Sequence, residues 1–457
     1  MLWLITLATP NAPTYNASSR CTTAVCRRVA AMEPTLPIAP PLVEDLLNPC
    51  IVPPAGSPAG SPECLPYVHV VSGWHMFADE SLGWLKRIKQ IDVRNGDGCF
   101  DDWSENGATR WVKSFGGPPD TGKVIMTHCN RLLSWYPAFA GRYTSAWGRF
   151  YGPCKDEYMK KATAQGKDYY STYLWPVCRP GALGAHDRAM GTEGAGSEAT
   201  PPFVLKALYG GAAKVRVLSA LRHPVDRLET AFWLHQHYPR HYGQSPQGLH
   251  KYVQEQTRAF SQCASRHDAR RCAHLFELLG EEYANIFFHA DQARTARLVL
   301  TALPYLPPHS HPLPPPATHD MVLTLIQVIR SLYEPFVRDW HAALGTSGFL
   351  VVRVDDLLDR AAETRMKVLA FLGLPVVVPA TVPSPQTSYA SFHAASLKAV
   401  HAQPMLSETR QMAEAFFKPY DDRLAAMYPS VAWPHGSTVV NGAAIANAIV
   451  LPGAHFD

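Results

Sequence analysis

Residues 215–233, "VRVLSALRHPVDRLETAFW", carry the clearest fold signal in the chain. The run from 215 to 221 is almost continuously apolar, which suits a β-strand that is covered on both faces. Pro224 then suits the first position of a helix, which we expect to extend to about His237. The apolar stripe of this helix consists of Val225, Leu228 and Phe232. The stretch therefore predicts a buried strand followed directly by a helix, with a charged junction between them.

The junction holds Arg222, at the carboxyl end of the predicted strand. In an open parallel sheet that edge is where ligands bind, and a helix N-terminus offers N–H groups and the positive end of a dipole. On a helical projection Thr230 falls away from the apolar stripe, on the side of His223, Asp226 and Arg227. An arginine fork, a helix N-terminus and a hydroxyl would together cradle a phosphate monoester. The alternative is that Arg222 pairs with Asp226 at i,i+4 and that Thr230 plays no part.

Strand and helix patterns alternate along the rest of the chain. Further strands are predicted at 67–74, 123–128 and 348–358. Further helices are predicted at 248–264, 322–344 and 363–374. Such alternation is typical of an α/β fold with a mainly parallel sheet.

The composition of the 457-residue chain, 47% hydrophobic and 18% charged, is that of a globular protein. The net charge of +4 gives no support for nucleic-acid binding. Residues 1–66 are rich in Pro, Ala and Ser and predict a disordered leader or stem. We expect one domain at 67–435, with a Pro-rich insertion at 303–319 and a tail at 436–457. The apolar start "MLWLITLA" is too short for a membrane anchor, so we expect any anchor to be missing or truncated.

The junction resembles the 3′-phosphate-binding segment of sulfotransferases that use 3′-phosphoadenylyl sulfate (PAPS). That segment is a strand, then Arg-x-Pro-x-x-Arg, then a serine eight residues after the first arginine. Arg222, Pro224 and Arg227 match, and Thr230 keeps the hydroxyl of the serine. The spacing of Cys263 and Cys272 is similar to that of carbohydrate sulfotransferases of the N-acetylgalactosamine-4-sulfate 6-O type, and further segments follow in the family's order from about 190 to 430.

The resemblance implies an α/β, P-loop-like three-layer sandwich with a mainly parallel central sheet, the sulfotransferase fold. It implies transfer of a sulfuryl group from PAPS to a hydroxyl of a polysaccharide or glycoprotein glycan, with Arg222 and Thr230 holding the 3′-phosphate. No metal is expected. The family's home is the Golgi lumen, with a type II membrane anchor. The resemblance also implies a disulfide between Cys263 and Cys272 in an oxidising compartment.

Two further parts of the family's site are harder to place in this chain. The family has a loop of the type Pro-Lys-x-Gly-Thr-Thr after its first strand, which binds the 5′-phosphosulfate. The best-placed stretch here is 123–139, where Thr127, His128, Asn130 and Arg131 are polar replacements, but the lysine, the glycine and the paired threonines are absent. For the base that takes the proton of the acceptor hydroxyl, the candidates are Glu193, which we favour, and Glu198.

Rival interpretations follow from these gaps. A degenerate sulfotransferase fold could bind a nucleotide or glycan without catalysis. A P-loop kinase or NTPase is suggested by "GPPDTGKV" at 117–124, but valine follows the lysine and the segment precedes a predicted strand, so a turn is the simpler interpretation. The run of His235, His237 and His241 crosses a predicted helix end near Pro239, so we do not expect it to bind a metal.

Overall fold

The computed structural model describes the central and C-terminal parts of the chain and several short segments before them. The described residues are 42–43, 47–51, 63–73, 82–94, 115, 122–129, 133, 153–154, 156–167, 177–178, 181, 200–210, 215–235, 237–273, 327–376 and 388–433. The Pro-rich insertion predicted at 303–319 and the tail predicted at 436–457 lie outside them.

The core of the fold is a five-stranded parallel sheet with the strand order β5-β6-β4-β7-β8. Its strands are β4 (Val68–Val71), β5 (Ile91–Val93), β6 (Val124–Cys129), β7 (Arg216–Leu221) and β8 (Phe349–Arg353). Strand β7 is buried along nearly its whole length between β4 and β8, as its apolar run predicts.

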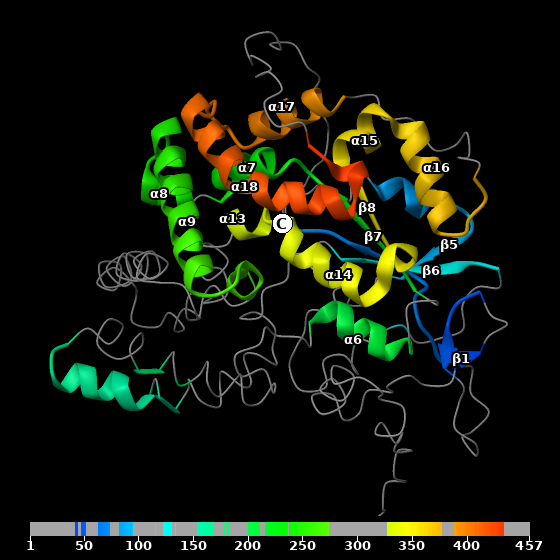
Figure 1. Ribbon diagram of the computed structural model, residues 1–457, viewed down its shortest axis with the longest axis horizontal. Helices are drawn as coiled ribbons and strands as arrows, with labels where there is room; N and C mark the ends of the chain where they lie inside the picture. The colour runs from blue at the N-terminus through cyan, green and yellow to red at the C-terminus, as the bar shows by residue number, and fades with distance from the viewer. Residues whose placement is uncertain are drawn as a thin grey trace, which may run out of the picture.

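Helices cover both faces of this sheet (Figure 1). One face packs against the 3₁₀ helix η2 (Gly83–Arg87) and helix α16 (Ala361–Phe371), whose apolar residues form one cluster with those of β4, β7 and β8. The other face is covered by α6 (Pro201–Leu208) and α14 (Tyr333–Gly348), where Trp340 stacks on Phe349 of β8. The predicted α/β class, with three layers and a parallel central sheet, is confirmed.

A second group of helices packs beside the sheet. Helix α7 (Pro224–Leu234) follows β7, and around it lie α8 (His237–Tyr242), α9 (Pro246–Arg266), α13 (Gln327–Arg330), α17 (Tyr389–Ala399) and α18 (Ser407–Met427). Phe232 of α7 is at the centre of an apolar cluster with α9, α13, α14 and α18. The disulfide implied between Cys263 and Cys272 is present and ties the end of α9 to the residues that follow it.

Several predicted element boundaries are wrong. The strand predicted at 348–358 ends at Arg353, because the acidic pair Asp355–Asp356 begins helix α15 (Val354–Asp359) and acidic residues favour a helix N-terminus. The helix predicted at 322–344 is interrupted at Leu332, which separates α13 from α14. Helix α7 ends at Leu234 instead of His237, and Pro239 lies inside α8 instead of ending a helix.

Part of the segment predicted as a disordered leader, 1–66, is ordered. Strands β1 (Leu42–Val43), β2 (Cys50–Ile51) and β3 (Glu63–Cys64) form a small antiparallel sheet, closed by a Cys50–Cys64 disulfide. Asn48 joins it to the main sheet: its Nδ2 donates to the Lys123 carbonyl at 2.8 Å, and its Oδ1 accepts from the Ile125 N–H at 2.7 Å. Composition alone did not reveal this attachment.

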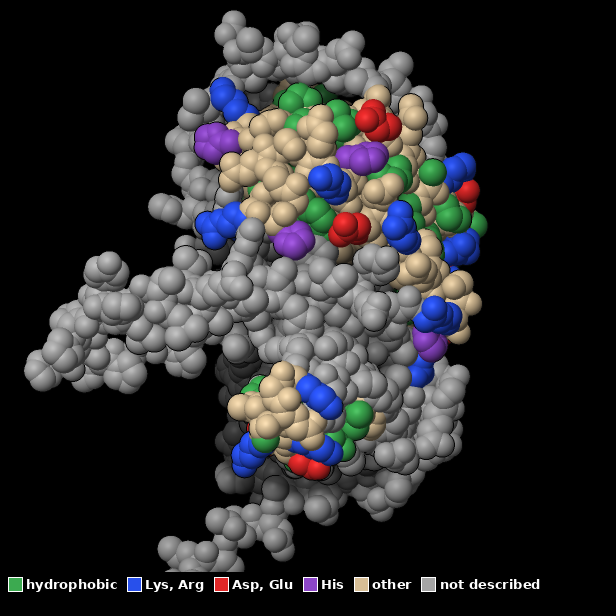
Figure 2. Space-filling model, turned by 90° about the vertical axis from the view of Figure 1, so that its left-hand side faces the viewer, with side chains coloured by type: hydrophobic (Ala, Val, Ile, Leu, Met, Phe, Trp, Pro, Cys, Tyr) green, Lys and Arg blue, Asp and Glu red, His purple; other side chains and the backbone are tan. Residues whose placement is uncertain are grey.

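The surface on the side of α8 and α9 is polar. Lys, Arg and His side chains are scattered over its described part among neutral atoms, and they do not gather into one patch (Figure 2). Among the helices that the structure describes, none is both long and apolar enough to cross a membrane.

Candidate functional site

The order of the strands identifies the edge at which a ligand would bind. From β4 the chain passes to β5 on one side of the sheet, whereas from β7 it passes to β8 on the other side. Strands β4 and β7 are neighbours, so the connections leaving them diverge. In open α/β sheets ligands bind at such a switch point, outside the carboxyl ends of the strands. The residues that leave these two ends are Ser72 and Gly73 after β4, and Arg222 after β7.

Arg222 is completely buried at this edge. Its Nη2 lies 2.6 Å from Nδ1 of His393, and its guanidinium lies over the ring of Phe392, 5.8 Å from the ring centre. The backbone carbonyl of Arg222 accepts a hydrogen bond from the Tyr333 hydroxyl at 2.8 Å. The arginine is therefore held between the sheet, helix α14 and helix α17, directly before the N-terminus of α7.

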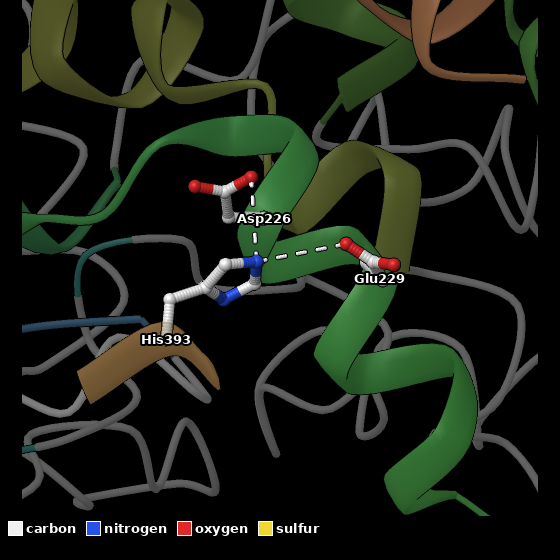
Figure 3. A group of neighbouring side chains, drawn as sticks. All are labelled: Asp226, Glu229 and His393. Atoms are coloured by element: carbon white, nitrogen blue, oxygen red, sulfur yellow. Dashed lines mark ion pairs between the residues drawn. The ribbon is translucent and has the colours of Figure 1, made fainter. Parts of the chain in front are cut away.

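Behind Arg222 is a group of charged side chains that comes from three helices. Asp226 and Glu229 belong to α7, and Nε2 of His393 lies 3.6 Å from a carboxylate oxygen of each (Figure 3). Arg410 of α18 approaches the same two carboxylates, with its Nη2 at 3.0 Å from Asp226 Oδ1 and 3.4 Å from Glu229 Oε2. The Tyr389 hydroxyl donates to Asp226 Oδ2 at 3.0 Å. We call Arg222, Asp226, Glu229, Tyr389, His393 and Arg410 the polar cluster.

The charges of this cluster keep Asp226 ionised. Burial by itself raises the pKa of the Asp226 carboxyl. Neighbouring positive or protonatable groups lower that pKa and outweigh the burial, so it lies well below the usual range of an aspartate. These groups are His393, His223, Arg410 and Arg222. A buried carboxylate with such neighbours is stabilised as an ion.

The polar cluster also contains a set of metal-ligand types. Ligand atoms of Asp226, Glu229 and His393 all lie within 4.8 Å of one another. Two guanidinium groups, those of Arg222 and Arg410, lie beside these atoms and repel a cation. The carboxylate oxygens already accept hydrogen bonds from Arg410, Tyr389 and the backbone N–H of Met405. We therefore interpret the cluster as an ion-pair network and not as a metal centre.

The polar side of α7 is buried as completely as its apolar stripe. Thr230 is 1% exposed, and its hydroxyl donates to the Asp226 carbonyl of the same helix at 3.0 Å. Arg227 is fully buried and donates to the Gln327 carbonyl, the Gln327 side-chain oxygen and the Ser331 hydroxyl, at 2.7–3.0 Å. Both sides of the helix are covered, because α8, α13, α17 and α18 all pack against α7.

Of the residues expected in the second phosphate loop, the structure describes Thr127 and His128, both in strand β6, which β4 separates from β7. Thr127 lies inside strand β6, is buried, and its hydroxyl lies 3.1 Å from Nδ1 of His69. The other ring nitrogen of His69 lies 2.8 Å from the Tyr209 hydroxyl, so Thr127 belongs to a polar contact within the fold. His128 is the next residue of the same strand. Asn130, Arg131 and both candidate bases, Glu193 and Glu198, lie outside the described residues.

The strand order instead draws attention to the segment after β4. The expected family loop follows the first strand of the sheet, and in this fold the first strand is β4, not β6. Ser72, directly after it, is 1% exposed, and its hydroxyl has no hydrogen-bond partner among the described residues. Sequence reasoning missed Ser72, and it also missed His393, Tyr389 and Arg410. "YVHVVSG" already shows the strand-then-glycine pattern, but the α17 and α18 residues carry no local signal.

Comparisons with known proteins find distant likenesses among solved structures. No family model matches the chain, and no curated protein matches it. The chain is similar in structure to a sulfotransferase from Alicyclobacillus acidocaldarius, at a TM-score of 0.34 and 12% identity, over 79% of this chain and 95% of that one. At this identity and TM-score the likeness assigns neither an activity nor a ligand to the chain.

Proposed function

We propose that the protein is a sulfotransferase that takes a sulfuryl group from PAPS and transfers it to a glycan hydroxyl. The observation that carries the proposal is the position of Arg222, buried at the switch point between β4 and β7 and directly before α7. A guanidinium and a helix N-terminus together are suited to bind a phosphate. The resemblance of residues 216–233 to the 3′-phosphate segment of PAPS enzymes says which phosphate this would be.

The parts of the site would have distinct tasks. Arg222 and the first turn of α7 would bind the 3′-phosphate, and Arg227 would hold α7 against α13 through its three hydrogen bonds. The Thr230 hydroxyl would have to give up its hydrogen bond to the Asp226 carbonyl before it could donate to the phosphate. The segment that begins Ser72-Gly73 would receive the 5′-phosphosulfate, since it follows the central strand beside β7.

The reaction itself would be an in-line displacement at sulfur. A base, for which Glu193 and Glu198 are the candidates, would take the proton of the acceptor hydroxyl. The acceptor oxygen would form a bond to sulfur while the bond from sulfur to the 5′-phosphate oxygen breaks, leaving 3′-phosphoadenosine 5′-phosphate. The acceptor class, a polysaccharide or glycoprotein glycan, comes from the resemblance to carbohydrate sulfotransferases. That resemblance, together with the disulfides, supports a place in the Golgi lumen.

One observation favours a second candidate function, nucleotide or glycan binding without catalysis. Residues 72–82, "SGWHMFADESL", contain no lysine. The family's loop uses a lysine to balance the charge that develops on the leaving group, and electrostatic stabilisation of this kind is a large part of catalysis. A labelled PAPS assay with a mixed glycan acceptor separates the two candidates, because the binding protein would retain the nucleotide but transfer no label.

The phosphate assignment is tested by Arg222→Ala. We expect 3′-phosphoadenosine 5′-phosphate to bind about ten- to hundredfold more weakly, the loss of one or two charge-assisted hydrogen bonds, while adenosine 5′-phosphate binds as before. Isothermal titration calorimetry measures both ligands, and Arg222→Lys tests whether charge alone is enough. Arg360→Ala is the matched control, since Arg360 is exposed and pairs with Asp356, which is not a member of the polar cluster. Equal losses for both nucleotides would show that Arg222 has a structural role instead.

A further inference from the structure

Helix α17 covers Arg222 with side chains that are at most partly buried. None of its eleven residues is buried, although the helix has a complete N-cap in which Ser388 accepts from the Ser391 N–H. It is attached at its first turn, where the Tyr389 N–H donates to Asp359 at 2.8 Å and the Tyr389 hydroxyl donates to Asp226. One turn later His393 meets Arg222. The helix therefore contributes particular side chains to this edge, and its apolar packing is that of the partly buried Tyr389 and Phe392 against the cluster of the sheet.

The contact between His393 and Arg222 selects the tautomer of the neutral imidazole. A guanidinium has only donors, so Nδ1 of His393 must accept the hydrogen bond from Arg222 Nη2. The proton of the neutral ring is then on Nε2, which faces Asp226 Oδ1 and Glu229 Oε2 at 3.6 Å each. The ring of Tyr389 stacks on His393, with the two planes 8° apart. The carboxylates and Tyr389 thus orient His393, and His393 in turn orients Arg222.

We infer that His393 is a positioning residue of the donor site, which holds the Arg222 guanidinium in the orientation that receives the 3′-phosphate. This inference rests on the function proposed above. An arginine carries five N–H donors, so its bond to His393 is compatible with an anionic partner. Arginine also has a long flexible stem, and its orientation must be fixed before a phosphate can use the planar fork. His393 on one side and the Phe392 ring over the guanidinium supply that restraint before the ligand arrives.

The effect of this restraint on nucleotide affinity is large enough to measure. Ordering a side chain with many rotamers costs about 0.5–1.5 kcal/mol, so its loss weakens binding about two- to tenfold. We expect His393→Ala to weaken the binding of 3′-phosphoadenosine 5′-phosphate by this factor and to leave the binding of adenosine 5′-phosphate unchanged. Calorimetry on the full chain measures both affinities. His393→Asn should bind nearly as the original protein does, because the Asn oxygen is the same number of bonds from Cβ as Nδ1 and accepts a hydrogen bond. His393→Gln places its acceptor one bond further and should resemble His393→Ala.

Ser396→Ala is the matched control on the same helix. The Ser396 hydroxyl donates to the Phe392 carbonyl within α17, so its removal perturbs the helix without touching Arg222. Its binding of both nucleotides should stay the same. Thermal unfolding of each variant checks that the fold persists, and if His393→Ala does not fold, the pair of Asn and Gln variants carries the comparison.

The outcomes separate this inference from the proposed function. If the original protein does not prefer the 3′-phosphorylated nucleotide, the proposed function fails. If it does prefer it and His393→Ala binds both nucleotides unchanged, or loses both equally, His393 is not a positioning residue. Tighter binding of the 3′-phosphorylated nucleotide by His393→Ala would also overturn the inference, since it would show that the imidazole competes with the phosphate for Arg222.

Discussion

Helices α7 and α17 both adjoin Arg222, yet they are built in opposite ways. Ten consecutive residues of α7, from Pro224 to Trp233, are buried, whereas no residue of α17 is. Helix α7 is therefore fixed by burial of apolar surface. Helix α17 is fixed by the contacts of His393 with Arg222 and of Tyr389 with Asp226, and by partly buried Tyr389 and Phe392 at the margin of the sheet's apolar cluster. The α7 side of the candidate site thus belongs to the core. The α17 side can move or unfold locally with the loss of few interactions.

The largest test of this contrast replaces an aromatic residue in each helix. Phe232 of α7 is completely buried against Trp233, Tyr238 and Tyr252, so Phe232→Ala should lower the free energy of unfolding by about 3–5 kcal/mol. Phe392 of α17 is half-buried, and Phe392→Ala should cost about 1 kcal/mol. Denaturant titration followed by circular dichroism measures both. Similar losses in the two variants would remove the distinction between the helices.

A smaller effect is expected from the disulfide that supports the α7 side. Helix α9 packs in the same apolar cluster as α7, and the Cys263–Cys272 bridge closes its C-terminal end. Replacing both cysteines by serine should lower the free energy of unfolding by about 2–3 kcal/mol, the value for a short closed loop. Because α17 is not part of that cluster, nucleotide binding by the folded variant should not change. A variant that keeps its stability but loses binding would contradict this division.

The smallest expected effect is the loss of stability at low pH that comes from Asp226, the carboxylate at which α7 and α17 meet. The pKa of Asp226 is depressed in the folded protein, so its contribution to stability is present above the ordinary aspartate pKa of about 4 and is lost as the pH falls below it. Since Tyr389 and His393 of α17 contact this carboxylate, acid should loosen α17 before α7, which amide hydrogen exchange at a series of pH values would detect. Asp226→Asn should remove this acid-dependent step.

A second buried carboxylate provides the control for that pH series. Burial in α18 raises the pKa of Asp421 to about 8, so the folded state keeps its proton at a pH where the unfolded state has lost it. Stability from this group therefore falls as the pH rises from about 4 to about 8, the opposite direction to Asp226. Asp421→Asn should flatten the neutral part of the profile and leave the acid part unchanged.

The sequence predicted those parts of the protein that depend on neighbours in the chain. The apolar run of β7, the proline that starts α7 and the stripe of Val225, Leu228 and Phe232 are all local patterns, and each is confirmed. The same projection could not show that Thr230 and Arg227 are buried as well, because helices α13, α17 and α18, which pack against α7, come from residues about 100–180 positions later.

The strand order also could not be obtained from local patterns. We placed the second phosphate loop after β6, but the sheet puts β4 beside β7 and makes the segment after β4 the neighbour of Arg222. The contact between Arg222 and His393 spans 171 residues and follows no spacing rule. The part of the site that the sequence indicated is a strand, a junction and a helix in succession. The part that the sequence did not indicate, the segment after β4 and the side chains of α17, is brought to Arg222 by the order of the strands and helices in space.

The attachment of the small N-terminal sheet has a practical consequence for anyone who prepares this protein. Strand β4 begins to pair with β6 where the Tyr67 N–H donates to the Ile125 carbonyl. Asn48 continues that pairing backwards, because its side chain satisfies the Ile125 N–H and the Lys123 carbonyl as a strand backbone would. A protein shortened to begin at Tyr67, where the composition changes, would lack Asn48. The Lys123 carbonyl and the Ile125 N–H would then have lost these hydrogen-bond partners at an exposed strand edge, and such edges favour aggregation. Expression should therefore begin before Leu42 and keep Cys50 and Cys64 oxidised.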